Sequence, residues 1–412
     1  MRTRHPRCQT SISLAGLLSS YAAAILAVVL LSACAGEREN PLPPASGKTL
    51  RIVSSLPFKG ASAHQARLIS RAIDLAIEEN GSTLPGWTLE HLPLDGGDDE
   101  TGDWSARKEE ANARAAGADP SVIAYIGPYA SGAAAISLPI LNEAGLLQGL
   151  PVATWPGLTQ EGWAAGEPGR YYPTGVQTMV RLMPPDSAQA IAAASKAHQL
   201  GAGTAFIIHD GSDYSLGMAA AFQGAAEKLG INVAARINAE SSSEGGWGNA
   251  EAPDVVFVAP SNLTVAVTAA RRISANPPRI SVFSTDVVLS DQLSQEGRQL
   301  MEGWYVVFNG DASPGDPARF EDFASRFERR YGEQPSQYAA NAFDLTAALL
   351  EATRRVGPDR GKIASEVLAG TYEDAISAPL RFDAHGDAAG GHLTLYRLTG
   401  GEFVEQEELA VP

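Results

Sequence analysis

The chain has 412 residues, of which 44% are hydrophobic and 19% charged, and its formal net charge is −16 at pH 7. This composition is that of an ordinary globular protein, and the length favours two domains at about 100 to 200 residues per domain. Because so acidic a surface repels phosphate backbones and anionic lipid headgroups, the charge argues against nucleic acid as a partner.

The first 33 residues have the pattern of a lipoprotein signal peptide. Arginines near the N-terminus precede a largely apolar run over about residues 14–31, and the run ends in the lipobox sequence LSAC at 31–34. In lipoproteins with this motif the signal peptide is cut before the cysteine. The acyl chains then added hold the protein on a membrane more firmly than a single chain does. We therefore predict a signal peptide at 1–33, lipidation of Cys34 and a flexible linker at 34–48.

A transmembrane helix is the alternative interpretation of this apolar run. The small residues before Cys34 and the polar sequence GEREN that follows make it the weaker one. Cys8 is lost with the signal peptide, so the mature protein has no free thiol for a disulfide, a nucleophile or a metal site. We expect an extracytoplasmic protein, in the periplasm or at the cell surface, that is lipid-anchored to a bacterial membrane.

From residue 49 the predicted elements alternate between strand and helix, which is the order of a parallel sheet covered by helices on both faces. A stretch rich in glycine and proline at 155–177 interrupts the alternation and is typical of a crossing between domains. Before it we expect strands at 49–56, 88–94, 122–126 and 150–154, and helices at 63–79, 105–116 and 130–144. After it we expect strands at 204–209, 231–237, 254–259 and 279–284, and helices at 186–200, 215–229, 263–274, 317–331 and 337–356, with short strands in the tail at 378–409.

The loop at 127–132 links a predicted strand to a predicted helix. Helix N-termini at the carboxyl ends of parallel strands bind anionic groups, and Ser131 adds a hydroxyl. A phosphate loop does not fit, because Ala133 and Ala134 stand where lysine and serine or threonine are required, and no dinucleotide fingerprint opens a helix here. A carboxylate is the favoured ligand, and a tight turn that holds nothing is the alternative.

Enzyme interpretations find little support in the sequence. None of the seven histidines has metal-ligand spacing with another histidine or a cysteine, and the nucleophile-elbow pattern is absent. His209 and Asp210 are more simply a turn at a strand end than an acid and base pair. The acidic loop at 95–103 lacks the calcium-binding loop pattern and is more typical of a solvated turn. We expect no enzyme activity, no metal and no cofactor.

Four segments together resemble a known family, and the last of them is a later run that ends in LRFDAHGD. In their order and spacing they are similar to the type I periplasmic solute-binding proteins of the leucine/isoleucine/valine-binding kind, which deliver substrate to ABC importers. The similarity spans about residues 49–398. Its segments are IGPYASGA at 126–133, PVATWPGLTQ at 151–160, FIIHDGSDYSLG at 206–217, and the later run, which extends from RFEDF to LLEA at 319–352 and ends in LRFDAHGD at 380–387.

The resemblance implies an α/β periplasmic-binding-protein-like fold of type I with two lobes, each a mainly parallel sheet flanked by helices. Three hinge crossings are expected, near 173–177, 303–309 and 377–381. Lobe 1 would then comprise 49–174 and 309–378, and lobe 2 would comprise 175–308 and 379–412.

The resemblance also implies a ligand site between the lobes. Ser131 matches the family's carboxylate-binding serine, and Val152 and Thr154 match the next contact pair. Tyr214 matches an aromatic residue from the second lobe, with a helix cap as the alternative. Asp286 stands where an acid meets the ligand's ammonium group, with an exposed turn as the alternative.

Two positions depart from the amino-acid binders. Gln65 and Ser261 occupy places where aromatic residues are common, so the pocket is more polar or larger, and a branched aliphatic ligand is in doubt. Trp155 is either an apolar wall that compensates or a packed loop residue. A polar or aromatic amino acid, a short peptide or an amide is as defensible as leucine.

The function predicted from the sequence is that of a substrate-binding lipoprotein of an ABC importer, monomeric and without catalytic activity, with a membrane permease as its partner. The alternative is a lipoprotein of the same fold that serves as a protein-binding platform, as in activators of cell-wall synthases. An extracytoplasmic hydrolase is a weaker third interpretation.

Overall fold

The computed structural model describes residues 42–43, 45, 47–80, 84, 86–239, 251–275, 277–290, 292–309, 317–377 and 379–410. Residues 42–412 form one compact unit. The predicted signal peptide, Cys34 and most of the predicted linker lie outside the described residues. Within the described part of the chain, none of the helices has both the length and the hydrophobicity that a membrane span requires.

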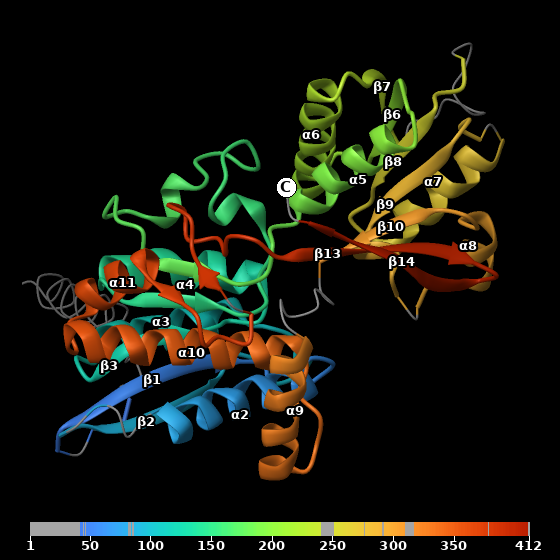
Figure 1. The fold of residues 1–412 in the computed structure, drawn as a ribbon. Helices are drawn as coiled ribbons and strands as arrows, with labels where there is room; N and C mark the ends of the chain where they lie inside the picture. Colours follow the sequence, from blue (N-terminus) through green and yellow to red (C-terminus); the bar gives the residue numbers. More distant parts are fainter. Residues whose placement is uncertain are drawn as a thin grey trace, which may run out of the picture. The chain divides into compact units, whose positions relative to one another are not determined.

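The first sheet has five parallel strands in the order β2-β1-β3-β4-β5 (Figure 1). Successive residues of a strand face opposite sides, so Ile52 and Leu56 of β1 pack against one helix layer and Val53 packs against the other. The strands are β1 (Thr49–Leu56), β2 (Thr88–Asp95), β3 (Val122–Ile126), β4 (Leu147–Leu150) and β5 (Met179–Arg181). One layer holds α2 (Ala63–Asn80), α9 (Pro317–Tyr331), α10 (Gln337–Val356) and α11 (Arg360–Ala369), and the other holds α3 (Ala106–Ala118) and α4 (Ser131–Glu143).

The second sheet has seven strands in the order β14-β13-β10-β9-β8-β6-β7, and β13 runs antiparallel to both of its neighbours, while the other pairs are parallel. Ile207 of β6 faces the layer of α5 (Ser187–Gln199) and α6 (Asp213–Lys228), whereas Ile208 faces α7 (Leu263–Ala275). The strands are β6 (Thr204–His209), β7 (Asn232–Asn238), β8 (Val255–Ala259), β9 (Ser281–Thr285), β10 (Tyr305–Phe308), β13 (His392–Thr399) and β14 (Glu402–Ala410). This architecture confirms the predicted fold of two mainly parallel sheets flanked by helices.

The predicted strand at 150–154 is wrong in position. The observed strand is β4, which ends at Leu150, and the following residues leave the sheet. Pro151 has no N–H to donate to a neighbouring strand, and the N–H groups of Thr154 and Trp155 bond to a side chain instead. The sequence analysis also missed β5, β10, α11 and the short helix α8 (Gln295–Leu300).

Strand pairing places the first and third passages between the sheets at later residues than we predicted, whereas the second passage falls within the predicted range of 303–309. β5 still pairs with β4, so the chain leaves the first sheet after Arg181 and not at 173–177. β10 pairs with β9, so the chain leaves the second sheet after Phe308. Near the end, β12 (Leu380–Arg381) pairs with β11 (Thr371–Tyr372), and the chain joins the second sheet only at His392.

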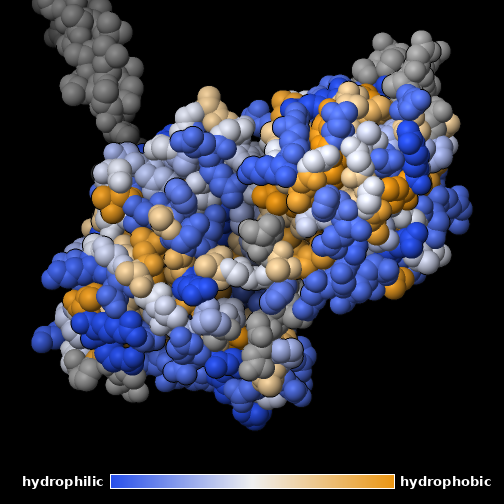
Figure 2. Space-filling view, turned by 45° about the horizontal axis from the view of Figure 1, so that its top comes forward, coloured by the Kyte–Doolittle hydropathy of each residue, from blue (hydrophilic) through white to orange (hydrophobic). Residues whose placement is uncertain are grey.

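The visible surface is mostly hydrophilic. Figure 2 shows hydrophilic residues over much of the visible face, with hydrophobic residues interspersed in separate patches. Large exposed hydrophobic side chains include Trp87 and Trp104, and Trp104 is 41% exposed.

Candidate functional site

The glycine loop that we predicted to bind an anion joins β3 to α4. Gly127 has a φ of 111°, and a Cβ added there would lie 2.9 Å from the carbonyl oxygen of Ser55, so this position requires glycine. Ser131 is the first residue of α4, and its Oγ accepts hydrogen bonds from the N–H groups of Thr154 (3.1 Å) and Trp155 (3.2 Å). The hydroxyl hydrogen of Ser131 is left to donate to a ligand.

Three of the predicted site residues line one hollow at the carboxyl end of the first sheet. Ser131, Val152 and Thr154 meet there around a volume of about 300 Å³. This is at the small end of the range for ligand pockets, which is about 300 to 1,000 Å³. The same hollow is lined by residues that the sequence analysis did not select, namely Pro57, Ser62, Asp103, Trp104, Tyr129, Ala130 and Ala153.

The acidic loop at 95–103 positions Trp104 beside this hollow. Asp95 accepts a hydrogen bond from Nζ of Lys108 (3.1 Å), which ties the start of the loop to α3. Trp104 forms an isolated β-bridge with Gly97, which closes the loop on itself. The loop is therefore an ordered scaffold for Trp104, and our interpretation of it as a simple solvated turn was incomplete.

Trp155 is held from behind by its own hydrogen bond. Its indole N–H donates to Oε1 of the buried Glu167 at 3.1 Å. The ring lies edge-on to Trp163, with centroids 5.3 Å apart, and 6.5 Å from the ring of Tyr214. With its N–H already bonded, the half-buried indole offers only hydrocarbon surface to a ligand.

Two carboxyl groups, those of Asp186 and Asp286, interact electrostatically near the carboxyl end of β9. Gln189 connects them, because its Oε1 accepts from the N–H of Asp286 (3.0 Å) and its Nε2 donates to Oδ1 of Asp186 (3.2 Å). Asn309 also donates to Oδ1 of Asp186 at 3.1 Å. Burial raises the pKa of both carboxyl groups above the ordinary value of 3.8, and repulsion by Asp186 raises the pKa of Asp286 further. Burial and both nearby acids raise the pKa of Tyr214 well above its ordinary value.

Thr154 connects the two groups of site residues. Its N–H bonds to Ser131, as described, and its carbonyl oxygen accepts from the N–H of Asp186 at 3.0 Å. The nearby Thr154 hydroxyl also lowers the pKa of the Asp186 carboxyl group, against the larger effect of burial. A short contact chain therefore runs from Ser131 through Thr154 to Asp186 and on to Asp286.

The two remaining predicted residues are less clearly part of this group. Gln65 lies in the first turn of α2, and its Oε1 is buried without a hydrogen-bond partner among the described residues. Ser261 follows β8 and is exposed, with its N–H bonded to Oδ2 of Asp210 at 2.9 Å and its Oγ bonded to Asn262 at 3.2 Å. Both stand at the carboxyl ends of strands, as expected of site residues in such sheets.

A buried ion pair supports the wall of the site. Arg181 is fully buried at 0% exposure and pairs with Asp387 at 2.7 Å. Its Nη1 donates to the carbonyl oxygen of Trp155 (2.8 Å) and its Nη2 to Oγ1 of Thr159 (2.9 Å). The pair thus fixes the backbone beside Trp155 to two segments that pass between the sheets.

Among the described residues, a serine, a histidine and an aspartate form a hydrogen-bonded series that the sequence analysis did not find. Oγ of Ser54 lies 2.8 Å from Nε2 of His91, and Nδ1 of His91 lies 2.7 Å from Oδ1 of Asp74. These are the distances of a catalytic triad. Ser54 is fully buried inside the first sheet, so its hydroxyl has no access to a substrate. These three hydrogen-bonded residues are therefore structural. No group of acidic, histidine or cysteine side chains with metal-binding geometry occurs in the described part of the chain.

Comparison with known proteins shows the family of this chain. A family model described as periplasmic binding protein matches residues 49–402. The chain belongs to the periplasmic binding protein family. This confirms the resemblance that the sequence motifs indicated. No match was found among the curated proteins.

Solved structures of other periplasmic binding proteins share the fold. A leucine-binding protein of Thermotoga maritima is 22% identical, with a TM-score of 0.61, over 87% of this chain and 98% of that chain. A branched-chain amino acid binding protein of Streptococcus pneumoniae, in complex with isoleucine, is 18% identical, with a TM-score of 0.61, over 88% and 100%. A solute-binding protein of Rhodopseudomonas palustris, in complex with 3,4-dihydroxybenzoic acid, is 16% identical, with a TM-score of 0.61, over 89% and 98%.

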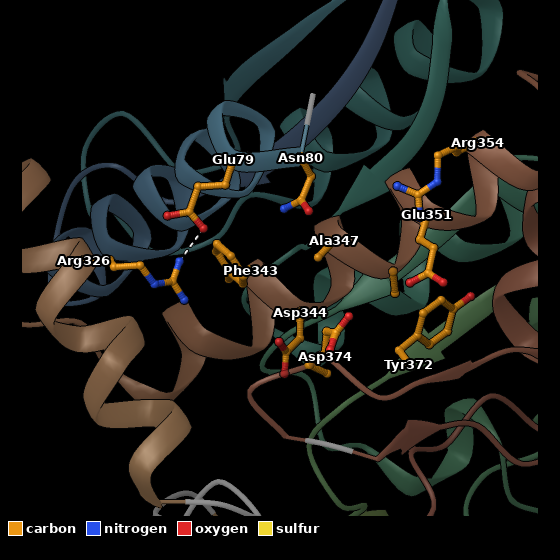
Figure 3. Close-up of a pocket in the computed structure, with 12 residues that line it drawn as sticks. Glu79, Asn80, Arg326, Phe343, Asp344, Ala347, Glu351, Arg354, Tyr372 and Asp374 are labelled. Atoms are coloured by element: carbon orange, nitrogen blue, oxygen red, sulfur yellow. Dashed lines mark hydrogen bonds and ion pairs between the residues drawn. The ribbon is translucent and has the colours of Figure 1, made fainter. Parts of the chain in front are cut away.

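This periplasmic binding protein has a larger hollow elsewhere, of about 470 Å³, among α2, α9 and α10 (Figure 3). Its charges are mostly engaged within the protein. Glu79 pairs with Arg326, and the carboxylate of Asp344 accepts from the N–H groups of Ile376 (2.8 Å) and Ser377 (2.9 Å). None of the predicted site residues lines this hollow, and we do not assign it to the binding site.

Sequence reasoning about this periplasmic binding protein missed four residues of the site region. Asp186 and Gln189 were included only as the start of a helix, and Asp103 only as part of an acidic loop. Trp104 could have been selected from the sequence, because it is a tryptophan within a polar turn that directly follows a predicted strand. An aromatic residue in such a turn at the ligand edge of a parallel sheet is a candidate contact.

Proposed function

We propose that this protein is the extracytoplasmic substrate-binding component of an ABC importer and binds an amino acid or a related small amide or peptide. The observation that carries the proposal is the opposite polarity of the two residue groups that Thr154 connects. Ser131 and the N-terminus of α4 offer hydrogen-bond donors, which suit a carboxylate. Asp286 and Asp186 offer acidic oxygens, which suit an ammonium group. An α-amino acid carries both groups on one carbon.

The mechanism that we propose is hinge closure around the ligand. A ligand that contacts both lobes favours the closed form by its difference in affinity for the two forms, and the importer would recognise that form. The leucine, isoleucine and 3,4-dihydroxybenzoic acid named for proteins of the same fold support a small carboxylate-bearing solute. Binding makes and breaks no covalent bond, so we propose no catalytic role.

Thermal unfolding of the purified protein against a panel of amino acids, amides, short peptides and organic acids tests this function. A ligand at 100 times its dissociation constant stabilises the folded state by about 2.7 kcal/mol. For a protein of this size that corresponds to a shift of roughly 5 to 10 °C, at about 2 to 4 °C per kcal/mol. The protein is first refolded to remove any ligand retained during purification. If no compound of the panel then shifts the unfolding temperature, the result would instead favour the protein-binding platform.

We also propose that Cys34 carries the lipid anchor. Cys34→Ser removes the acylated thiol, so the protein is expected to lose incorporation of labelled palmitate. Cys8→Ser is the matched control, because Cys8 would be cut away with the signal peptide, and it should leave palmitate incorporation unchanged. Labelling that persists in Cys34→Ser would contradict lipidation at Cys34.

A further inference from the structure

The hollow beside Ser131 contains one ionisable side chain that has no partner. Ten described residues line it, and these include one acid, Asp103, and no base. The Asp103 carboxylate is exposed and forms no ion pair or hydrogen bond with the described residues. The other aspartates of the same loop are engaged, since Asp95 and Asp99 bind Lys108 and Asp98 accepts from the N–H groups of the turn.

Trp104 stands next to Asp103 and keeps a ring surface open. Its ring packs on the first turn of α4, where a Cβ added at Gly132 would lie 2.7 Å from Cζ2 of the indole. That contact fixes the ring position, while the side chain remains 41% exposed. Tyr129 lines the same hollow and packs edge-on against Tyr338, with ring centroids 6.1 Å apart. An indole face beside an unpaired carboxylate attracts a cation.

We propose that the ligand is an amino acid with a cationic side chain, whose stem packs on Trp104 and whose charge pairs with Asp103. This inference rests on the proposed function, because it places the α-carboxylate of the same ligand at Ser131. The volume of about 300 Å³ suits one amino acid better than a peptide. The formal net charge of −16 also favours the approach of a cation.

Closure of the site selects between a cationic and a neutral side chain. When the second lobe covers the hollow, water leaves the Asp103 carboxylate, and burial of an unpaired charge is costly. A leucine or phenylalanine side chain leaves that carboxylate without a partner. A guanidinium or ammonium group supplies the partner, and its hydrocarbon stem covers the indole.

Calorimetric titration with L-arginine and L-citrulline tests the proposal. The two ligands have nearly the same shape, and citrulline lacks the side-chain charge. We expect arginine to bind at least about 30-fold more tightly than citrulline or leucine. Asp103→Asn should weaken arginine about tenfold or more and leave citrulline nearly unchanged, which lowers the ratio of the two affinities. Trp104→Leu should weaken arginine as well.

Glu100→Gln is the matched control. It removes the same charge from an exposed side chain of the same loop, outside the lining of the hollow, and should leave the ratio unchanged. If citrulline or leucine binds as tightly as arginine, or if Asp103→Asn leaves the ratio unchanged, the cationic class is overturned and the amino-acid site stands. If no amino acid binds, both the inference and the proposed function fail.

Discussion

Arg181→Met is expected to lower the free energy of unfolding by about 3 to 5 kcal/mol. Removing one partner of a buried ion pair leaves the other partner charged and poorly solvated, and this costs more than the pair contributed as a whole. Asp387 is only 13% exposed, so it would be left in that condition. The substitution also removes the hydrogen bonds to the carbonyl oxygen of Trp155 and the hydroxyl of Thr159. Methionine fills much of the same space, which limits any contribution from a cavity.

Chemical denaturation of the unliganded protein measures this effect. Arg271→Met is the matched control, because Arg271 pairs with Glu296 at 2.9 Å on the surface, where both side chains are 57% exposed. Exposed pairs contribute about 0 to 1 kcal/mol, so this control should change stability little. Equal, small losses in the two variants would show that the Arg181 pair does not stabilise the fold as we argue.

Asp286→Asn is expected to change ligand affinity and stability in opposite directions. Loss of the carboxylate should weaken an amino acid by about 30-fold or more, since truncating one member of a buried charge pair costs about 2 to 5 kcal/mol. The unliganded variant should be more stable than the native protein at pH 8, because it no longer holds two half-buried carboxylates against each other. If Asp286 only supported the fold, Asp286→Asn would lower the stability of the unliganded protein.

The raised pKa of Asp286 gives this prediction a pH dependence. A carboxyl group whose pKa is higher in the folded state holds a proton that the unfolded chain releases, so stability falls as the pH rises from about 4 towards the native pKa. The stabilisation by Asp286→Asn should therefore be present at pH 8 and absent near pH 4. Binding of an ammonium group to the ionised pair should strengthen as the pH rises from 5 to 8.

Titration calorimetry and thermal unfolding at pH 5 and pH 8 measure the two effects of Asp286→Asn. Asp213→Asn is the control, because Asp213 is an exposed acid at the start of α6, at the same edge of the sheet. It should leave affinity nearly unchanged at both pH values. Native affinity in Asp286→Asn would remove Asp286 from the ligand site.

Most of the fold could be predicted because its elements are long and their hydrophobic pattern is regular. Four strands are almost wholly buried, namely β1, β3, β6 and β8. The helices α2 and α10 are several turns long, and each has buried apolar residues at helical spacing. The error at 150–154 has a local cause. Val152 and its neighbours have the composition of a strand, but Pro151 cannot donate to the sheet and Ser131 captures the next free N–H groups.

The site was only partly predictable because its remaining residues act through contacts that are distant in sequence. Asp186 becomes part of the site through Asn309, which lies 123 residues further along the chain. Glu167 matters because it bonds to the indole of Trp155, and nothing in the pattern around it indicates that contact. Ser54, His91 and Asp74 show the same limit, because only the pairing of β1 with β2 brings the serine and the histidine together.

A crystal structure with the amino acid that gives the largest thermal shift tests directly whether Ser131 and Asp286 bind the ligand. We expect one ligand per chain, with its carboxylate within hydrogen-bond distance of Ser131 and its ammonium group within hydrogen-bond distance of Asp286. A ligand in the hollow among α2, α9 and α10, or one that contacts neither Ser131 nor Asp286, would contradict this expectation.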